Sequence, residues 1–378
     1  MIASTSAVTD RVRDAAERRA PLRLRGRGTW MAANRPVHGA EELPLDGLSG
    51  IVEYVPGDFT ITVRAGTTLG EISAATNEHR QWLPLDPPGG APGSIGATVA
   101  TASCGPLASA FGTPRDHLLG VEFVTGTGDT VRGGGRVVKN VAGFDLVRLS
   151  TGAWGTLGVI TELSLRLRSR PPADETYACG VGDDAEALAW VCTALRALTA
   201  APLAAELVNA TLARTIGLDG GSSLLVRIGG NAESMRAQRE ALARVGSFAP
   251  TDPGVWNRLS APRADDAAVW RLSQRPSAFA DTWTSAREAL AAAPHGWMHG
   301  SLLRGVVRCG VPGAPADVAG AVARALMHPF DGTRIGELLP EHAWSLLPSP
   351  AMDRLSRGIR SAFDPTHILN PGILGEGA

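Results

Sequence analysis

The sequence predicts an α+β protein with two domains. Two observations predict this class: segments with the period of strands alternate with segments with the period of helices, and the pair Pro171-Pro172 interrupts the chain near its middle. A length of 378 residues, of which 44% are hydrophobic, is enough for two or three domains with cores of normal size. We therefore place a first domain at residues 1–172 and a second at residues 173–345, followed by a C-terminal segment at residues 346–378.

The first domain is expected to begin with a short charged helix at residues 11–20. Residues 22–25 then alternate leucine with arginine, which is the period of a strand, and this strand ends in the loop Gly26–Thr29. The other expected elements are a strand at residues 60–65, a helix that begins at the capping-box pair Thr68 and Glu71, a hairpin of strands at 118–124 and 130–132, and a strand at 159–167.

The second domain shows the same alternation without a motif of its own. Its expected elements are strands at Tyr177–Val181, Leu224–Ile228 and Leu302–Val307, and helices that begin at Asp183, run from Asn231 to Arg244, and span Val318–Leu326. A last helix is expected at Met352–Ala362. This order predicts one antiparallel sheet covered by helices.

Composition excludes several classes of function. The 36 basic side chains are balanced by 37 acidic ones, so a nucleic acid is not expected as the main partner. The cysteines at 104, 179, 192 and 309 form no C-x-x-C pair, which argues against an iron–sulfur cluster or a structural zinc site in this chain, and we expect no metal. No apolar run reaches the ~18–20 residues of a membrane span. We expect a cytoplasmic protein that reaches a membrane only through partner subunits.

Two series of glycines are the strongest chemical signal. Gly90, Gly93 and Gly96 surround Ser94, and a second series occurs at 152, 155 and 158. Glycine loops of this kind either turn the chain or offer backbone amides to an anion, and neither series is the dinucleotide fingerprint G-x-G-x-x-G. Their order along the chain, together with the Gly26–Thr29 loop, favours a nucleotide cofactor.

At these residues the sequence resembles the p-cresol methylhydroxylase/vanillyl-alcohol oxidase (PCMH) type of FAD-binding flavoprotein. The blocks that carry the resemblance follow the order of that family, at residues 51–58, 62–67, 94–97, 112–116, 139–146, 155–162 and 370–372. They cover most of residues 22–170 and the end of the chain. The resemblance implies an FAD-binding domain of two subdomains, a compact α/β cap domain for substrate or partner, and a C-terminal segment that returns to the FAD domain.

The resemblance also implies the cofactor site. The loops Gly26–Thr29 and Gly93–Gly96 are expected to bind the FAD pyrophosphate, and the backbone of Gly158–Ile160 is expected to face the adenine end. Relatives with covalently attached flavin carry a histidine beside the first loop, where this chain has Thr29 and Trp30, so we expect non-covalent FAD. The full set of expected FAD-binding residues is Gly26, Arg27, Gly28, Thr29, Gly90, Gly93, Ser94, Ile95, Gly96, Ala97, Ala100, Gly105, Arg115, Asp116, Gly158, Val159, Ile160 and Asn370.

Within that family the chain resembles the FAD-binding subunits of glycolate oxidases. The block Lys139–Leu146, which contains the only lysine of the chain, and the compact second domain carry this similarity. It implies a small 2-hydroxy acid as substrate, oxidation of glycolate to glyoxylate, and two kinds of partner: a second FAD subunit and an iron–sulfur subunit. Two alternatives stay open, namely a non-catalytic subunit that uses FAD as an electron relay or structural element, and a stand-alone FAD-dependent alcohol oxidase.

No catalytic residue is assigned by the sequence. His295 and His299 have i,i+4 spacing, but no carboxylate accompanies them, so ordinary surface or interface histidines are expected there. Arg304 and Arg308 are candidates to hold a substrate carboxylate, because a guanidinium binds a carboxylate through two parallel hydrogen bonds.

Overall fold

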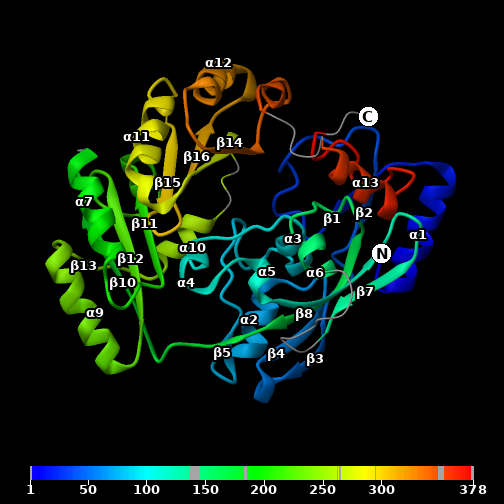
Figure 1. Cartoon of the computed structure of the whole chain (residues 1–378), viewed down its shortest axis with the longest axis horizontal. Helices are drawn as coiled ribbons and strands as arrows, with labels where there is room; N and C mark the ends of the chain where they lie inside the picture. The colour runs from blue at the N-terminus through cyan, green and yellow to red at the C-terminus, as the bar shows by residue number, and fades with distance from the viewer. Residues whose placement is uncertain are drawn as a thin grey trace. The chain divides into compact units, whose positions relative to one another are not determined.

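The computed structural model describes residues 2–135, 145–182, 185–261, 263, 265–293, 295–347 and 353–375. Lys139 and the rest of its block up to Phe144 lie outside the described residues. The chain divides into two compact units (Figure 1). Unit 1 comprises Met1–Gly105, Gly112–Arg170 and Ser349–Ala378, and unit 2 comprises Pro106–Phe111 and Pro171–Pro348. The second unit therefore includes a short segment from the N-terminal half of the chain, which the sequence did not predict.

The larger part of unit 1 is a five-stranded antiparallel sheet. Its strands are, in spatial order, β3 (Ile51–Val55), β4 (Thr60–Arg64), β8 (Val159–Arg166), β6 (Leu118–Val124) and β7 (Thr130–Gly134). Alternate residues such as Val63, Leu163 and Leu165 are fully buried and pack with the helices α2 (Leu69–Asn77) and α3 (Ile95–Ala100). The capping box of Thr68 and Glu71 begins α2, as predicted, and β6 and β7 form the predicted hairpin.

A second, smaller part of unit 1 surrounds a parallel pair of strands, β1 (Leu22–Arg25) and β2 (Glu41–Pro44). Leu22 also forms a parallel bridge with Leu369, so the C-terminal segment lies beside β1. The helix α1 (Thr5–Arg18) begins earlier than predicted, because Ser4 caps it by accepting a hydrogen bond from the amide of Ala7 at 3.2 Å. Val8, Val12, Ala15, Leu22, Leu43, Ile368 and Leu369 share one buried cluster.

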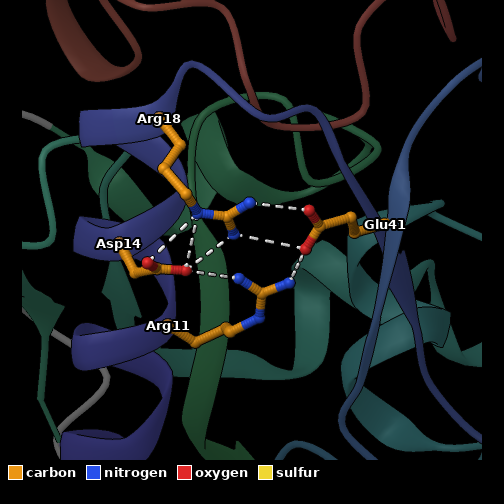
Figure 2. Close-up of polar contacts among 4 residues, drawn as sticks. All are labelled: Arg11, Asp14, Arg18 and Glu41. Carbon is orange, nitrogen blue, oxygen red and sulfur yellow. Dashed lines mark hydrogen bonds and ion pairs between the residues drawn. The ribbon is translucent and has the colours of Figure 1, made fainter.

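Charged side chains join α1 to β2 at the surface (Figure 2). Asp14 pairs with Arg18 at 2.7 Å and with Arg11 at 2.8 Å, and Glu41 pairs with Arg18 at 2.9 Å and also with Arg11. The hydrogen bonds from these arginines lower the pKa of the Glu41 carboxyl to about 2. The network fixes the helix to the strand pair from the solvent side.

Short elements complete unit 1. They are the 3-10 helix at Pro56–Asp58, β5 (Gln81–Trp82), α5 (Pro114–His117), α6 (Leu146–Ser150), β9 (Arg168–Ser169) and α13 (Arg354–Phe363). After α13 the buried carboxylate of Asp364 accepts hydrogen bonds from the amides of Ile368 and Leu369, at 3.2 and 2.8 Å. This turn directs the C-terminal segment along β1.

Unit 2 is built on one eight-stranded antiparallel sheet, as predicted. Its strands are, in spatial order, β13 (Ala249–Pro250), β10 (Ala173–Gly180), β12 (Ser223–Gly230), β11 (Ala204–Val208), β15 (Trp297–Ser301), β16 (Val306–Pro312), β14 (Asp266–Ser273) and β17 (Thr333–Leu338). The helices that pack on one shared apolar core are α7 (Ala185–Arg196), α9 (Ala232–Val245), α11 (Phe279–Leu290) and α12 (Pro315–Met327), all labelled in Figure 1. They cover the main apolar core of the unit. Smaller helices, α4 (Ala108–Phe111), α8 (Ala210–Thr215) and α10 (Val255–Ser260), complete unit 2.

One predicted strand of unit 2 is wrong. The apolar run Leu302–Val307 does not continue as a strand, because residues 302–305 form the turn between β15 and β16. The amide of Gly305, at φ +68°, donates to the carbonyl of Ser301 at 3.0 Å. Only glycine adopts this backbone conformation without strain, so Gly305 was the available signal for a turn.

Candidate cofactor site

A deep cleft lies within unit 1, between the strand β1, the start of α3 and the loop that precedes β8. The space between its walls is about 1010 Å³, part of which is open to solvent. The expected cofactor residues that line it are Gly26, Arg27, Gly28, Thr29, Gly93, Ser94, Gly96, Ala97, Ala100, Gly158, Ile160 and Asn370. The two glycine loops, which are far apart in the sequence, therefore meet at one site.

The loop Gly26–Thr29 offers backbone amides to the cleft. Within the described residues none of these four amides donates a hydrogen bond to the protein, and Gly28 has the left-handed φ of +71° that favours glycine. A Cβ atom on Gly26 would lie 2.3 Å from Oγ of Ser94, so the loop approaches the second glycine segment too closely for a side chain. Consecutive free amides of this kind bind phosphate oxygens.

The second glycine segment contributes differently from what was expected. The amides of Ile95 and Gly96 donate to the carbonyls of Thr67 and Ala65, at 2.9 and 2.8 Å, so they are already used by the protein. Gly96 is instead required for packing, since a Cβ there would lie 2.7 Å from Cβ of Ala65. This segment also brings to the cleft the hydroxyl of Ser94, which is buried and has no hydrogen-bond partner in the described structure.

Asn370 closes the cleft from the C-terminal segment. Its Oδ1 accepts a hydrogen bond from the amide of Leu24 at 2.9 Å, and its Nδ2 donates to the carbonyl of Trp154 at 2.7 Å. Only 3% of the residue is exposed. Because both polar atoms of the amide are used by the protein, Asn370 holds β1 and the loop before β8 together and lines the cleft with the rest of its surface.

Six of the expected cofactor residues do not line the cleft: Gly90, Ile95, Gly105, Arg115, Asp116 and Val159. Ile95 and Val159 are fully buried members of the apolar cores. The carboxylate of Asp116 accepts hydrogen bonds from Thr113, at 2.7 Å from its amide and 2.8 Å from its hydroxyl, and so caps α5. Ile95, Val159 and Asp116 thus have structural roles of their own, and contact of all six residues with a cofactor stays a prediction.

The sequence reasoning missed several wall residues, among them Arg23, Leu24, Trp30, Trp154 and Gly155. Gly155 belongs to a glycine series that was noticed, and its φ of +70° and the close approach of Leu24 explain why a glycine is needed. Arg23 and Leu24 precede the first glycine loop on β1. Proximity to that loop in the sequence was the signal that could have identified them.

A smaller cavity adjoins the cleft and shares Gly155, Gly158 and Ile160 with it. Its other walls are mostly apolar and come from Phe123, Leu149, Ser150, Ala153 and Leu157. A Cβ on Gly158 would lie 2.3 Å from the ring of Phe123. The cavity is too small for a ring of a cofactor, so the expectation that Gly158–Ile160 faces the adenine end stays a prediction.

Unit 2 carries a row of charged side chains across neighbouring strands. Glu206 on β11 accepts from Nδ1 of His299 on β15 at 2.8 Å, and the carboxylate is only 2% exposed. His299 is thus largely buried, with 13% of its side chain exposed, whereas His295 is exposed. The prediction of surface or interface histidines holds for His295, and for His299 the interface alternative stays a prediction. Arg308, directly opposite His299 on β16, donates to Glu337 at 2.6 Å.

The arginines of this row also determine the ionisation of Glu337. Burial raises the pKa of this carboxyl, and the charges of Arg308 and Arg271 outweigh burial, so that the pKa lies below its usual value. Arg308, a candidate for holding a substrate carboxylate, thus already binds a carboxylate of the protein.

Within the described ranges no group of three or more His, Cys, Asp or Glu side chains is placed to hold a metal ion. None of the described helices is long and apolar enough to cross a membrane.

The cleft has the features of a site for an anionic nucleotide. Comparison with known proteins shows which domain and which fold this part of the chain resembles. Residues 1–134 match the family model described as FAD binding domain. The fold is that of p-cresol methylhydroxylase: a crystal structure of that enzyme with substrate bound superposes with a TM-score of 0.76 over 99% of this chain and 88% of the enzyme, at 17% identity. The chain therefore has the fold of p-cresol methylhydroxylase, and its first 134 residues match an FAD-binding domain.

The chain is also similar in sequence to subunits of glycolate oxidases. The chain is 40% identical over 170 residues to the glycolate oxidase subunit GlcE of Escherichia coli (strain K12), which is 45% of this chain and 48% of that subunit. It is 33% identical over 161 residues to the glycolate oxidase subunit GlcD of Bacillus subtilis (strain 168), which is 42% of this chain and 34% of that subunit. The matched part thus spans about half or less of the length of each relative.

The cleft fits FAD on structural grounds. Free amides at Gly26–Thr29, the unpartnered hydroxyl of Ser94 and a close backbone approach at Gly26 are what a diphosphate requires. The charged side chains in the described wall are Arg23 and Arg27, and no acidic side chain accompanies them. A net positive wall stabilises the two negative charges of the diphosphate.

Proposed function

We propose that this chain is the FAD-binding subunit of a glycolate oxidase (dehydrogenase) complex. In that role it oxidises glycolate to glyoxylate and passes the electrons to an iron–sulfur partner, with a second FAD subunit in the same complex. The observation that carries the proposal is the 40% identity with a glycolate oxidase subunit in a chain whose matched FAD-binding domain forms a cofactor cleft. A cytoplasmic location is part of the proposal.

FAD supplies the acceptor for the hydride that leaves C2 of the hydroxy acid, while the hydroxyl proton goes to a base. The residues of this chain contribute binding and orientation. The amides of Gly26–Thr29 and the hydroxyl of Ser94 hold the diphosphate, and Asn370 keeps the walls of the cleft at a fixed separation. FAD is held without a covalent bond, because Thr29 and Trp30 stand where covalent relatives have a histidine.

Anaerobic reduction of the purified protein tests the proposal. The chain should be isolated yellow, and acid should release the chromophore as FAD. Glycolate is then added without oxygen to the chain alone, to the chain with its partner subunits, and to the partner subunits alone. Bleaching of the flavin in the chain alone supports direct oxidation by this subunit.

The other outcomes decide between the alternatives. Bleaching of this chain's FAD only when the partner subunits are present identifies the chain as an electron relay, and FAD that is never reduced identifies a structural role. Reduction by alcohols that lack a carboxylate, at rates above that with glycolate, would identify a stand-alone alcohol oxidase. Protein that folds but contains no flavin would overturn the proposal as a whole.

A further inference from the structure

Three arginines between Leu22 and Thr29 have different surroundings. Arg25 forms ion pairs with Glu42 at 2.9 Å and with Asp46 at 3.9 Å, and it is not part of the cleft wall. Its charge is compensated by two carboxylates of the protein. Arg25 thus needs no ligand.

Arg27 lines the cleft but is also held by the protein. Its Nε donates to the carbonyl of Gly66 at 2.9 Å, and its guanidinium lies 3.5 Å from the carboxylate of Glu71. The capping box at the start of α2 uses the same Glu71 oxygen. The charge of Arg27 is therefore partly compensated before any ligand binds.

Arg23 differs from both. It lines the cleft, and its guanidinium donates to one neutral group, the carbonyl of Met31, at 3.2 Å. No carboxylate of the described residues lies within ion-pair distance of it. Burial lowers the pKa of Arg23, and the more distant charge of Glu42 offsets this only in part. A half-buried cation without a counter-charge is destabilising unless an anion joins it.

The position of Arg23 indicates which kind of anion would pair with its guanidinium. Arg23 stands on β1, three residues before the glycine loop whose free amides face the same cleft, and the unpartnered hydroxyl of Ser94 belongs to the same wall. A guanidinium binds phosphate oxygens through paired N–H donors in a fixed plane, and free amides and a hydroxyl complete the coordination of a diphosphate.

We propose that Arg23 binds the diphosphate of FAD and makes this cleft selective for dinucleotide flavins over FMN and riboflavin. The loop amides recognise the shape of the diphosphate, and Arg23 supplies the charge that they lack. The inference depends on FAD as the cofactor and not on the oxidation of glycolate. The cleft is accordingly expected to bind ADP, which carries the diphosphate without the flavin ring.

Affinities measured on flavin-free protein test this assignment without any turnover. FAD, FMN, riboflavin and ADP are titrated against wild type and Arg23→Gln by calorimetry, at two salt concentrations. Loss of a charge-assisted contact predicts about ten- to hundred-fold weaker binding of FAD and ADP. Riboflavin affinity should stay unchanged, and the salt dependence of ADP binding should become weaker.

Two further variants control the experiment. Arg25→Gln removes a neighbouring charge of the same strand outside the cleft and should leave all four affinities at the wild-type values. Arg23→Lys keeps the charge without the planar fork and should bind ADP with intermediate affinity. Wild-type ADP affinity in both Arg23 variants, or an equal loss for riboflavin and FAD, would overturn the assignment. If Arg23→Gln does not fold, the ADP affinity of Arg23→Lys decides alone.

Discussion

The cleft of unit 1 and the charged row of unit 2 differ in how their buried polar groups are satisfied. In the cleft, Ser94 has no hydrogen-bond partner and Arg23 no carboxylate at ion-pair distance among the described residues. In the row, the carboxylates of Glu206 and Glu337 are paired with a histidine and an arginine of neighbouring strands. The row also leaves one buried atom without a hydrogen-bond partner among the described residues, Nε2 of His299. The two regions therefore differ in their charges: the carboxylates of the row are paired within the protein, whereas the guanidinium of Arg23 in the cleft is not.

Gly96→Val provides the strongest test of the cleft. The added side chain meets the backbone and Cβ of Ala65, which displaces α3 and with it the hydroxyl of Ser94. We expect the FAD content of the purified protein to fall to background, as read from the flavin absorbance, along with a loss of stability of about 1–3 kcal/mol from overpacking. Gly57→Ala is the matched control, because nothing lies within 4 Å of a Cβ at that exposed position. Full FAD occupancy in soluble Gly96→Val protein would show that this segment does not shape the cofactor site.

The variant His299→Leu tests whether the charged row of unit 2 stabilises the fold. Removing the histidine leaves the carboxylate of Glu206, 2% exposed, without its hydrogen-bond donor, and an unsatisfied buried acceptor costs about 1–3 kcal/mol. Urea unfolding should report this loss for unit 2, while the FAD content of the protein at low urea stays that of wild type. His328→Leu is the control, since His328 faces Glu288 across 3.7 Å at a more exposed site. Equal stability of the two variants would show that the contact between Glu206 and His299 does not stabilise unit 2.

The smallest change in stability is expected for the surface network of Figure 2, which belongs neither to the cleft nor to the charged row of unit 2. The pKa of Glu41 is lowered to about 2 in the folded chain, so its contribution is present above the pKa of the unfolded chain and is lost as the pH falls toward 2. Glu41→Gln should therefore flatten the acid limb of the stability curve slightly and leave stability at pH 7 and high salt nearly unchanged. A large change at neutral pH would show that α1 is held to β2 mainly by charge.

The two regions also differ in how far the sequence reveals them. Glycines that let two backbone segments approach closely stand near one another in the sequence, so Gly26–Thr29 and the glycines near Ser94 were visible as local patterns. The pair of Glu206 and His299 spans 93 residues and exists only because β11 and β15 are neighbours in a particular register. Cross-strand partners of this kind have no local signature, and that is why Glu206 was missed and His299 was considered without its partner.

Errors within unit 1 have a related cause. The alternation of residues 22–25 correctly predicted a strand, but alternation alone assigns both arginines to a solvated face. Arg25 does meet carboxylates there, while Arg23 lines the cleft because the segment after the glycine loop folds back and brings the carbonyl of Met31 to it. Gly96 lines the cleft as expected, and its contact with a cofactor stays a prediction. The amide that seemed available to a ligand is already bonded to Ala65.

The hydrogen bonds of Asn370 to Leu24 and Trp154 affect the order in which the parts of the protein fold during synthesis. The hydrogen bond between Leu24 and Asn370 joins residues 346 positions apart, and unit 2 is inserted almost whole between them. Domains generally fold as units while the chain emerges from the ribosome, so we expect unit 2 to be folded before residue 370 is available. The cofactor cleft is then the last part of the molecule to be completed, and FAD enters a protein in which everything but its own binding site is already in place.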